Sequence, residues 1–205
     1  TMDLKHDLES NRKILYWLSR KRWYSFLHMQ KKVAPKMKKI ITVSKSSKRD
    51  IVNDFKCKDV NISVVHNGLD TNVFKPHEGI KRHKYRLITT ASADVPLKGL
   101  DYTLQAIAEL KQNIDIELTV IGKMKEGGHT SRLIKKLNLN ELINFKTNLT
   151  KEEISIEYAK SSVAIVSSLY EGFGYPVIEA MSCATPLLAA KTSSIPELVG
   201  SYATL

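Results

Sequence analysis

Residues 168–181 read Ser168-Leu-Tyr-Glu-Gly-Phe-Gly-Tyr-Pro-Val-Ile-Glu-Ala-Met181, and this stretch decides how the chain is interpreted. The preceding apolar run, Val163-Ala-Ile-Val166, is typical of a buried strand, and Pro176 is typical of a helix start. The glycines between them let the backbone approach a ligand closely, and a helix N-terminus attracts phosphate. Two carboxylates, Glu171 and Glu179, stand on either side of the turn and suit sugar hydroxyls as hydrogen-bond acceptors. An anion site beside hydroxyl acceptors is the outline of a nucleotide-sugar pocket.

The pattern of apolar residues predicts strands that alternate with helices along most of the chain. Strands are expected over 39–43, 62–66, 86–91, 116–121, 143–146, 163–167 and 186–190. Helices are expected over 9–34, 45–55, 98–111, 129–137, 151–160, 176–184 and 195–199. Strands separated by single helices indicate parallel sheets with right-handed crossovers. We therefore expect an α/β fold built on a doubly wound parallel sheet.

A domain boundary is predicted near residues 67–84, where Gly, Pro and basic residues cluster as in linkers and loops. The segment after it, 85–205, holds enough elements for a complete doubly wound sheet. The segment before it, 1–70, holds two strands and two helices, which are too few to cover both faces of a sheet. We expect an incomplete domain over 1–70, a linker over 71–84 and a second domain over 85–205.

The charge of the chain is concentrated near its N-terminus. Residues 1–60 hold 16 Lys and Arg against 6 Asp and Glu, whereas the rest holds 16 against 15. Such a basic zone argues for an anionic partner, either a membrane surface or a nucleic acid. No apolar run reaches the roughly 18 residues of a membrane-spanning helix. Cys57 and Cys183 have neither metal nor disulfide spacing, which predicts buried thiols in a reducing compartment.

A glycine turn alone is a weak signal, and a tight turn between two solvated glutamates is the alternative. The full motif, however, resembles the signature of glycosyltransferase family 4, with seven residues between the glutamates and Glu-Ala-Met at the end. Further segments resemble the family in the same order: Ile40-Ile-Thr-Val-Ser44, Val64-Val-His-Asn-Gly-Leu-Asp70, Lys98-Gly99, Leu118-Thr-Val-Ile-Gly122 and Ile195-Pro-Glu-Leu-Val-Gly200. The similarity covers about residues 38–205.

The resemblance implies the two-domain GT-B fold. Residues 85–205 would be the Rossmann-like, nucleotide-sugar-binding C-terminal domain without its last helices. Residues 1–70 would be the end of a truncated, acceptor-side Rossmann-like domain. Because that acceptor side is mostly missing, we expect the 205-residue fragment to be inactive by itself.

The resemblance also implies a set of site residues. The donor would contact Ser92, Lys98, Gly99, Glu171, Gly172, Phe173, Gly174, Tyr175 and Glu179. Lys98 and Glu171 are the catalytic candidates, since Lys98 would neutralise the leaving diphosphate and Glu171 would contact the donor sugar. Glu179 would accept hydrogen bonds from the ribose hydroxyls. Ser92 and Ala93 stand where the family has an arginine, so one phosphate contact is absent and Ser92 is the candidate replacement. No metal and no other cofactor is expected, because enzymes of this fold generally transfer sugar without a divalent cation.

The function that the resemblance implies is a retaining, hexosyltransferase-type glycosyltransferase. It would move a sugar from a nucleotide diphosphate sugar to a glycan or lipid-linked acceptor. One alternative is a nucleotide-sugar-binding module without turnover, which the absent arginine favours. The other is a nucleic-acid-binding protein, which the basic N-terminal part suggests but no nucleic-acid motif supports. The motifs leave the base, the sugar and the acceptor open.

The predicted helix over 9–34 carries the cluster Trp17, Arg20, Lys21, Arg22, Trp23, Tyr24 and Phe26. Aromatic and basic side chains together suit an anionic membrane surface. The alternative is that the apolar face of this helix packs on its own sheet and leaves an ordinary solvated basic face. The expected location is the cytoplasm, with the inner face of the membrane as the place where lipid binding would hold the protein.

Overall fold

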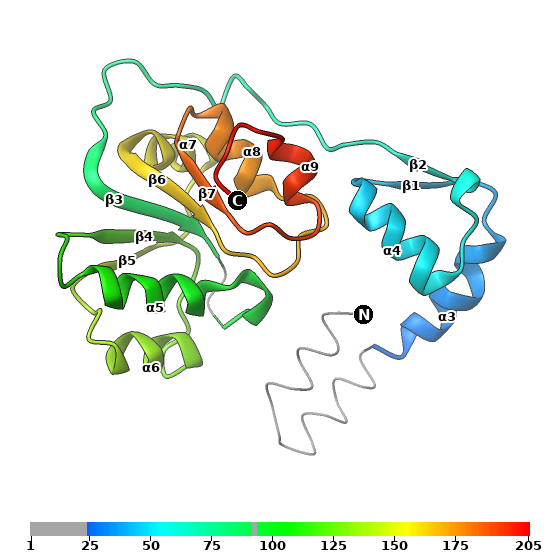
Figure 1. The fold of residues 1–205 in the computed structure, drawn as a ribbon, viewed down its shortest axis with the longest axis horizontal. Helices are drawn as coiled ribbons and strands as arrows, with labels where there is room; N and C mark the ends of the chain where they lie inside the picture. Colours follow the sequence, from blue (N-terminus) through cyan, green and yellow to red (C-terminus); the bar gives the residue numbers. More distant parts are fainter. Residues whose placement is uncertain (1–23, 92–93) are drawn as a thin grey trace.

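The computed structural model describes residues 24–91 and 94–205, which form two parallel β-sheets with flanking helices (Figure 1). Most of the helix predicted over 9–34 lies outside the described residues. Its described part forms α3 (Phe26–Val33), followed by the short 3-10 helix η1 (Ala34–Lys36). No residue of α3 is buried. In the predicted aromatic and basic cluster, only Tyr24 and Phe26 belong to the described residues.

The smaller sheet is a β-α-β unit near the N-terminus. β1 (Ile40–Thr42) pairs in parallel with β2 (Ile62–Val64), and α4 (Lys45–Phe55) with the 3-10 helix η2 (Asp59–Asn61) connects them. α4 begins after Ser44, whose Oγ accepts a hydrogen bond from the Ser47 amide at 3.0 Å, a common way to satisfy a free helix N–H. This local signal explains why the predicted helix over 45–55 is confirmed residue for residue.

The larger sheet has five parallel strands in the order β5-β4-β3-β6-β7. Its strands are β3 (His83–Thr90), β4 (Glu117–Ile121), β5 (Ile143–Lys146), β6 (Ser161–Val166) and β7 (Leu187–Ala189). The chain starts at the central β3, moves outward to β5, and then returns to the other side of β3 through β6 and β7. This order is that of a doubly wound sheet, so the predicted fold class is confirmed.

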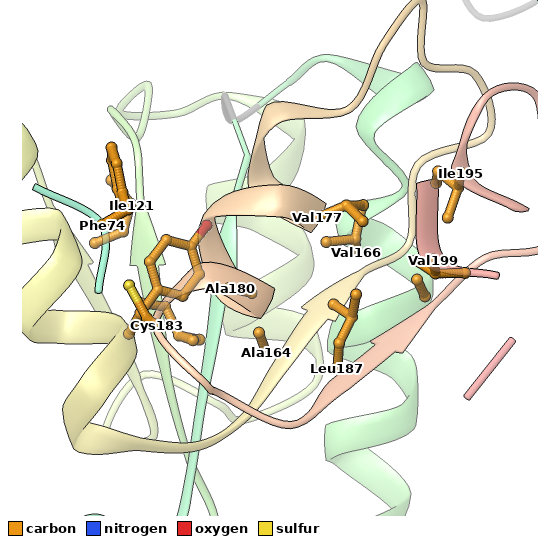
Figure 2. Packing of buried hydrophobic residues seen from close by; sticks show 13 residues of the cluster. Phe74, Ile121, Ala164, Val166, Val177, Ala180, Cys183, Leu187, Ile195 and Val199 are labelled. Carbon is orange, nitrogen blue, oxygen red and sulfur yellow. The ribbon is translucent and has the colours of Figure 1, made fainter. Parts of the chain in front are cut away.

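Helices cover both faces of the larger sheet (Figure 1). They are α5 (Leu100–Leu110), α6 (His129–Lys136), α7 (Lys151–Lys160), α8 (Tyr175–Ser182) and α9 (Ile195–Val199). Successive strand residues point to opposite faces, so Leu87 packs with α5 and α6 while Ile88 packs with α7, α8 and α9. Figure 2 shows the apolar cluster on the Ile88 face of the sheet. In it, Val166 and Leu187 of the sheet pack with Val177 of α8 and Val199 of α9.

The segment between β2 and β3 contains no helix or strand, and it is attached to the larger sheet. Phe74 is 3% exposed and lies in the same apolar cluster as α8. Ser182 donates a hydrogen bond to the Phe74 carbonyl, and His77 Nε2 lies 2.8 Å from Ser155 Oγ. Both cysteines are free and buried, as the sequence predicts.

One predicted boundary is wrong in a way that matters for the site. The helix expected over 98–111 begins only at Leu100, because residues 96–98 form a separate 3-10 helix, η3 (Pro96–Lys98). Gly99 stands between the two helices with φ 65°, a left-handed conformation that interrupts helical hydrogen bonding. Lys98 therefore precedes the helix and does not lie in it.

A charged cluster is buried where α7 crosses the larger sheet. Arg86 Nη2 lies 2.5 Å and Lys146 Nζ 2.8 Å from Glu157 Oε2. Burial by itself raises the pKa of Glu157. The hydrogen bond from Lys146 and the charges of Arg86, Lys146 and Lys160 outweigh that effect and leave the pKa below its ordinary value. Glu157 is consequently an ionised residue inside the fold.

Candidate functional site

The site lies where the carboxyl ends of β3 and β6 meet. β6 ends at Val166, and the following residues 167–174, which we call the glutamate turn, lead into α8. η3 and Gly99 follow β3 in the same way. Because β3 and β6 are parallel neighbours, the two loops emerge side by side at one edge of the sheet. This edge is where α/β sheets bind ligands.

Lys98 and Glu171, which the resemblance puts forward as catalytic candidates, are in direct contact. Lys98 Nζ donates to Glu171 Oε1 at 2.7 Å, and Ser168 Oγ donates to the same oxygen at 2.8 Å. The Glu171 amide in turn donates to Ser193 Oγ at 2.8 Å. Glu171 is 9% exposed, so it is not the solvated glutamate of the alternative interpretation. Its Oε2 accepts no hydrogen bond from the described residues and is available to a ligand.

Close backbone packing holds Lys98 in this position. A Cβ on Gly99 would lie 1.9 Å from the Ser167 carbonyl oxygen, so only glycine fits between the two loops. Ser167 Oγ donates to the Gly99 carbonyl at 2.9 Å, and the Leu169 amide donates to the Leu97 carbonyl at 2.8 Å. The Lys98-Gly99 pair therefore combines a charged side chain with the one residue that lets its loop approach the glutamate turn.

The glutamate turn offers backbone donors. Gly174 has φ 107° and stands directly before α8, where a left-handed conformation favours glycine. Ser194 Oγ lies 2.9 Å from the Glu171 carbonyl oxygen and 2.7 Å from that of Phe173, so the carbonyls are engaged. Within residues 24–91 and 94–205, the amides of Gly172, Phe173 and Gly174 donate to no protein acceptor. Free amides before a helix suit an anionic group.

Glu179 lies one turn into α8 and is half-buried. Its Oε2 accepts a hydrogen bond from the hydroxyl of Tyr158, on α7, at 3.2 Å. Burial raises the pKa of Glu179, and this effect exceeds the opposing effects of the Tyr158 hydrogen bond and the Lys151 charge. Burial, followed by the negative charge of Glu179, also raises the pKa of Tyr158 well above its ordinary value, so Tyr158 stays a neutral donor.

The smaller sheet contributes to the site through the start of α4. Ser47 Oγ donates to the Gly172 carbonyl at 3.1 Å, and the Tyr170 hydroxyl donates to Asp50 Oδ2 at 2.8 Å. The Lys45 amide lies 3.0 Å from both carboxylate oxygens of Glu197, on α9. The glutamate turn is therefore fixed from both sides, by α9 and its preceding serines and by α4.

The structure brings together most of the predicted donor-binding residues, and it adds others. Tyr175 is exposed at the first position of α8, next to the ring of Phe173. Ser92 and Ala93 lie outside the described residues, so the replacement of the family's arginine stays a prediction. The sequence motifs assign no role to the supporting residues Thr90, Tyr158, Ser168, Ser193 and Ser194. A buried polar residue beside a recognised motif would have been the only signal for them.

A cavity of about 550 Å³ lies next to the site but contains neither glutamate. It opens between the starts of α5 and α6 and is lined in part by Asp94, Asp101, Lys125, His129 and Arg132. The described residues include no cluster of three or more His, Cys, Asp or Glu side chains arranged for a metal ion. No helix in the described part is both long and apolar enough to cross a membrane.

Comparison with known proteins agrees with this architecture. The sequence pattern of "Glycosyl transferases group 1" matches residues 74–204, and that of "Glycosyltransferase Family 4" matches residues 4–73. The MMP alpha-(1->4)-mannosyltransferase of Mycolicibacterium hassiacum is 41% identical over 180 residues, which are 88% of this chain and 43% of that protein. A D-inositol 3-phosphate glycosyltransferase of Streptomyces bingchenggensis is 29% identical over 67% of this chain and 34% of its own length. The chain thus spans less than half the length of these relatives.

Solved structures show the same fold. HepE of Anabaena, in complex with UDP and glucose, has a TM-score of 0.72 at 21% identity, over 84% of this chain and 50% of that one. Sucrose-phosphate synthase of Thermosynechococcus elongatus has a TM-score of 0.73 at 20% identity, over 96% and 49%. The fold is that of the GT-B glycosyltransferases. With one family pattern covering most of its length, the chain belongs to the glycosyl transferases group 1 family.

Proposed function

We propose that the whole protein is a glycosyltransferase that uses a nucleotide diphosphate sugar, and that the Lys98–Glu171 site binds this donor. The observation that carries the proposal is the contact of a lysine and a buried glutamate beside three free amides. Two comparisons support it. A relative with 41% identity is named a mannosyltransferase, and HepE, which shares the fold, was solved with UDP and glucose.

The proposed roles follow from the chemistry of each group. Lys98 and the free amides of residues 172–174 stabilise the negative charge that develops on the leaving diphosphate. Glu171 Oε2 accepts a hydrogen bond from a hydroxyl of the donor sugar. Glu179 accepts hydrogen bonds from the ribose hydroxyls, since an ionised carboxylate oxygen can accept more than one hydrogen bond. No step in this scheme requires a metal ion.

We also propose transfer with retention at the anomeric carbon, to a glycan or lipid-linked acceptor. In this scheme the new bond forms on the face of the sugar from which the diphosphate leaves. Glu171 is not assigned as a nucleophile, because same-face transfer needs no protein nucleophile and its Oε2 is assigned to a hydroxyl of the donor sugar. The name of the mannosyltransferase relative is consistent with a sugar-containing acceptor. Analysis of the product's anomeric configuration by NMR would test retention.

Donor binding is tested by calorimetry with UDP, GDP and ADP sugars, after a thermal-shift screen has identified the nucleotide that stabilises the protein. Substitutions Glu171→Ala and Glu179→Ala should each weaken binding by roughly 1–3 kcal/mol, the cost of unpairing hydrogen-bonded groups. Glu141→Ala is a matched control, since Glu141 is exposed and outside the site. Unchanged affinity in both site variants would overturn the assignment.

Binding without turnover is the second candidate function, because Ser92 and Ala93 replace the arginine typical of the family. The two candidates separate in an assay of the whole protein with its donor. Release of free nucleoside diphosphate, with or without an added acceptor, supports the enzyme. Tight donor binding with no release over hours supports the binding module.

We further propose that the basic N-terminal part binds anionic membrane surfaces, which would place the protein at the inner face of the membrane. In the described part, α3 exposes Phe26, Met29 and Val33 by 42%, 61% and 48%. Lys31 and Lys32 lie in its last turn. Each basic residue near an anionic surface contributes about 1 kcal/mol.

Liposome co-sedimentation tests this second proposal. Binding should require acidic lipid, fall with added salt, and drop in a Lys31→Glu, Lys32→Glu double variant. If the protein ignores acidic liposomes even at low salt, the membrane proposal is wrong. In that case the apolar side of α3 is better explained as a packing surface for the rest of the protein.

A further inference from the structure

A chain of three hydrogen-bonding groups runs from the sheet to Glu179. The Tyr158 hydroxyl lies 3.0 Å from Thr90 Oγ1 and 3.2 Å from Glu179 Oε2. Tyr158 is 1% exposed, Thr90 is the last residue of β3, and Glu179 lies on α8. Three separate elements therefore meet at a single buried hydroxyl, near the carboxyl end of β3, the strand that leads to Lys98.

Packing alone does not account for a hydroxyl in this place. A phenylalanine would fill the same apolar space without a polar atom to satisfy, and a buried polar group is costly unless it is hydrogen-bonded. The hydroxyl here has one proton. Two neighbours can only accept it: the Glu179 carboxylate at 3.2 Å and, at the longer distance of 3.5 Å, the Pro176 carbonyl. Tyr158 consequently donates to Glu179, and Thr90 donates to the Tyr158 oxygen.

We propose that Tyr158 is a positioning residue of the donor site, which holds the Glu179 carboxylate by Oε2 and leaves Oε1 to the ribose hydroxyls of the nucleotide. Glu179 Oε1 accepts no hydrogen bond from the described residues, so one oxygen is held and the other is available. The proposal rests on the donor site described above. It adds a residue that touches neither the donor nor the reacting atoms and acts only through Glu179.

The charged and titratable neighbours of Glu179 predict a distinctive signature. Lys151 and Tyr158, on α7, both lower the pKa of Glu179, whereas burial raises it more strongly. Cys183, directly after the end of α8, also faces Glu179, but burial raises the pKa of its thiol and keeps it neutral. Loss of the Tyr158 hydroxyl removes one of the two groups that favour the ionised carboxylate. The pKa of Glu179 should then rise further, and donor binding should fail at a higher pH on acidification.

The test compares four proteins by calorimetry with UDP and with GDP, from pH 8 to pH 5: the natural sequence, Tyr158→Phe, Glu179→Ala and the double variant. We expect Tyr158→Phe to weaken binding of the nucleotide that binds better by about 3- to 10-fold at pH 7.5, the value of one hydrogen bond. The acidic fall in affinity should also begin at a higher pH. In the Glu179→Ala background the same substitution should change nothing. Tyr202→Phe is the matched control, because Tyr202 is 86% exposed.

Each outcome has a distinct meaning. If Glu179→Ala weakens binding but Tyr158→Phe changes neither the affinity nor the pH profile, the positioning role is wrong and the donor site stands. A loss in Tyr158→Phe that persists in the Glu179→Ala background also overturns it, since the tyrosine then acts through the fold. If Glu179→Ala has no effect, Glu179 does not contact the nucleotide and the positioning role of Tyr158 is wrong, whereas the donor site as a whole is overturned only if Glu171→Ala is also without effect. Should Tyr158→Phe not fold, Thr90→Val removes the donor behind the hydroxyl and should give the same pH shift with a loss of about twofold.

Discussion

Lys98 Nζ donates to Glu171 Oε1 at 2.7 Å, although 73 residues separate the two in the sequence. The pair joins the group proposed to bind the diphosphate with the group proposed to bind the sugar. Lys98 is about one-third exposed and Glu171 one-tenth, so a ligand reaches the pair from the lysine side. A bound diphosphate would therefore share Lys98 with Glu171 and place the sugar next to that carboxylate.

Removal of the lysine charge should weaken donor binding more than removal of an ordinary surface charge. We expect Lys98→Met to cost roughly 1.5–3 kcal/mol of binding free energy for the nucleoside diphosphate, the range for hydrogen bonds to charged groups. Lys135→Met is the control, since Lys135 is exposed on α6. Calorimetry at two salt concentrations measures both, and the effect of Lys98→Met should shrink at high salt. Equal losses in the two variants would contradict the proposed role.

Gly99 should tolerate no side chain. Gly99→Ala combines a left-handed conformation with a contact of 1.9 Å to the Ser167 carbonyl, so we expect a loss of about 2–4 kcal/mol in the free energy of unfolding. Gly79→Ala separates the two causes, because Gly79 has φ 78° but no atom within 4 Å of an added Cβ. Urea unfolding of both variants measures the difference. If they are equally destabilised, the close approach of the two loops is not what requires glycine at residue 99.

Glu157 should make the fold sensitive to acid. Glu157→Gln leaves Arg86 buried beside a neutral partner, and we expect a loss of about 3–5 kcal/mol in the free energy of unfolding at pH 7. The pKa of Glu157 is lowered in the folded state, so its stabilising effect is present above the ordinary glutamate pKa and is lost as the pH falls through the lowered value. Urea unfolding between pH 7 and pH 3 should show the natural and variant proteins converging.

The control for this measurement is Glu117→Gln. Glu117 also contacts Arg86, at 3.3 Å, but its side chain is 59% exposed, so solvent screens the pair. Its loss should cost about 0–1 kcal/mol. A stability difference between the natural protein and Glu157→Gln that grows on acidification would contradict the assigned direction of the pKa shift.

Glu197 should tie the start of α4 to the larger sheet. Both of its carboxylate oxygens lie 3.0 Å from the Lys45 amide, so Glu197→Ala should cost about 0.5–2 kcal/mol, like the loss of a helix cap. Hydrogen exchange should become faster at the Lys45 and Ser47 amides and stay unchanged in β4. Glu109→Ala, at an exposed position of α5, should change neither. Unaltered exchange at the start of α4 would show that this contact does not hold the two sheets together.

Several elements follow from the sequence because their signals are local. α7 spans the predicted residues 151–160, since Thr150 and Glu153 form a reciprocal capping box at its start. The buried strand, glycine turn and helix around Glu171 are likewise encoded in adjacent residues. The glutamate motif, together with the further matching segments, predicted the family and the candidate site residues. The alternation of apolar strands with helices predicted the doubly wound sheet.

Other features depend on the tertiary structure alone. The contact between Lys98 and Glu171 exists because β3 and β6 are neighbours in the sheet, an order that hydrophobic periodicity does not encode. Tyr158 belongs to no motif, and only the packing of α7 against α8 brings its hydroxyl to Glu179. α5 begins after Lys98 because Gly99 is left-handed where its loop packs against the glutamate turn, and that packing leaves no space for a Cβ at residue 99. Local sequence determines which elements form, whereas contacts between distant loops are decided by how parallel strands order themselves to bury both faces of the sheet.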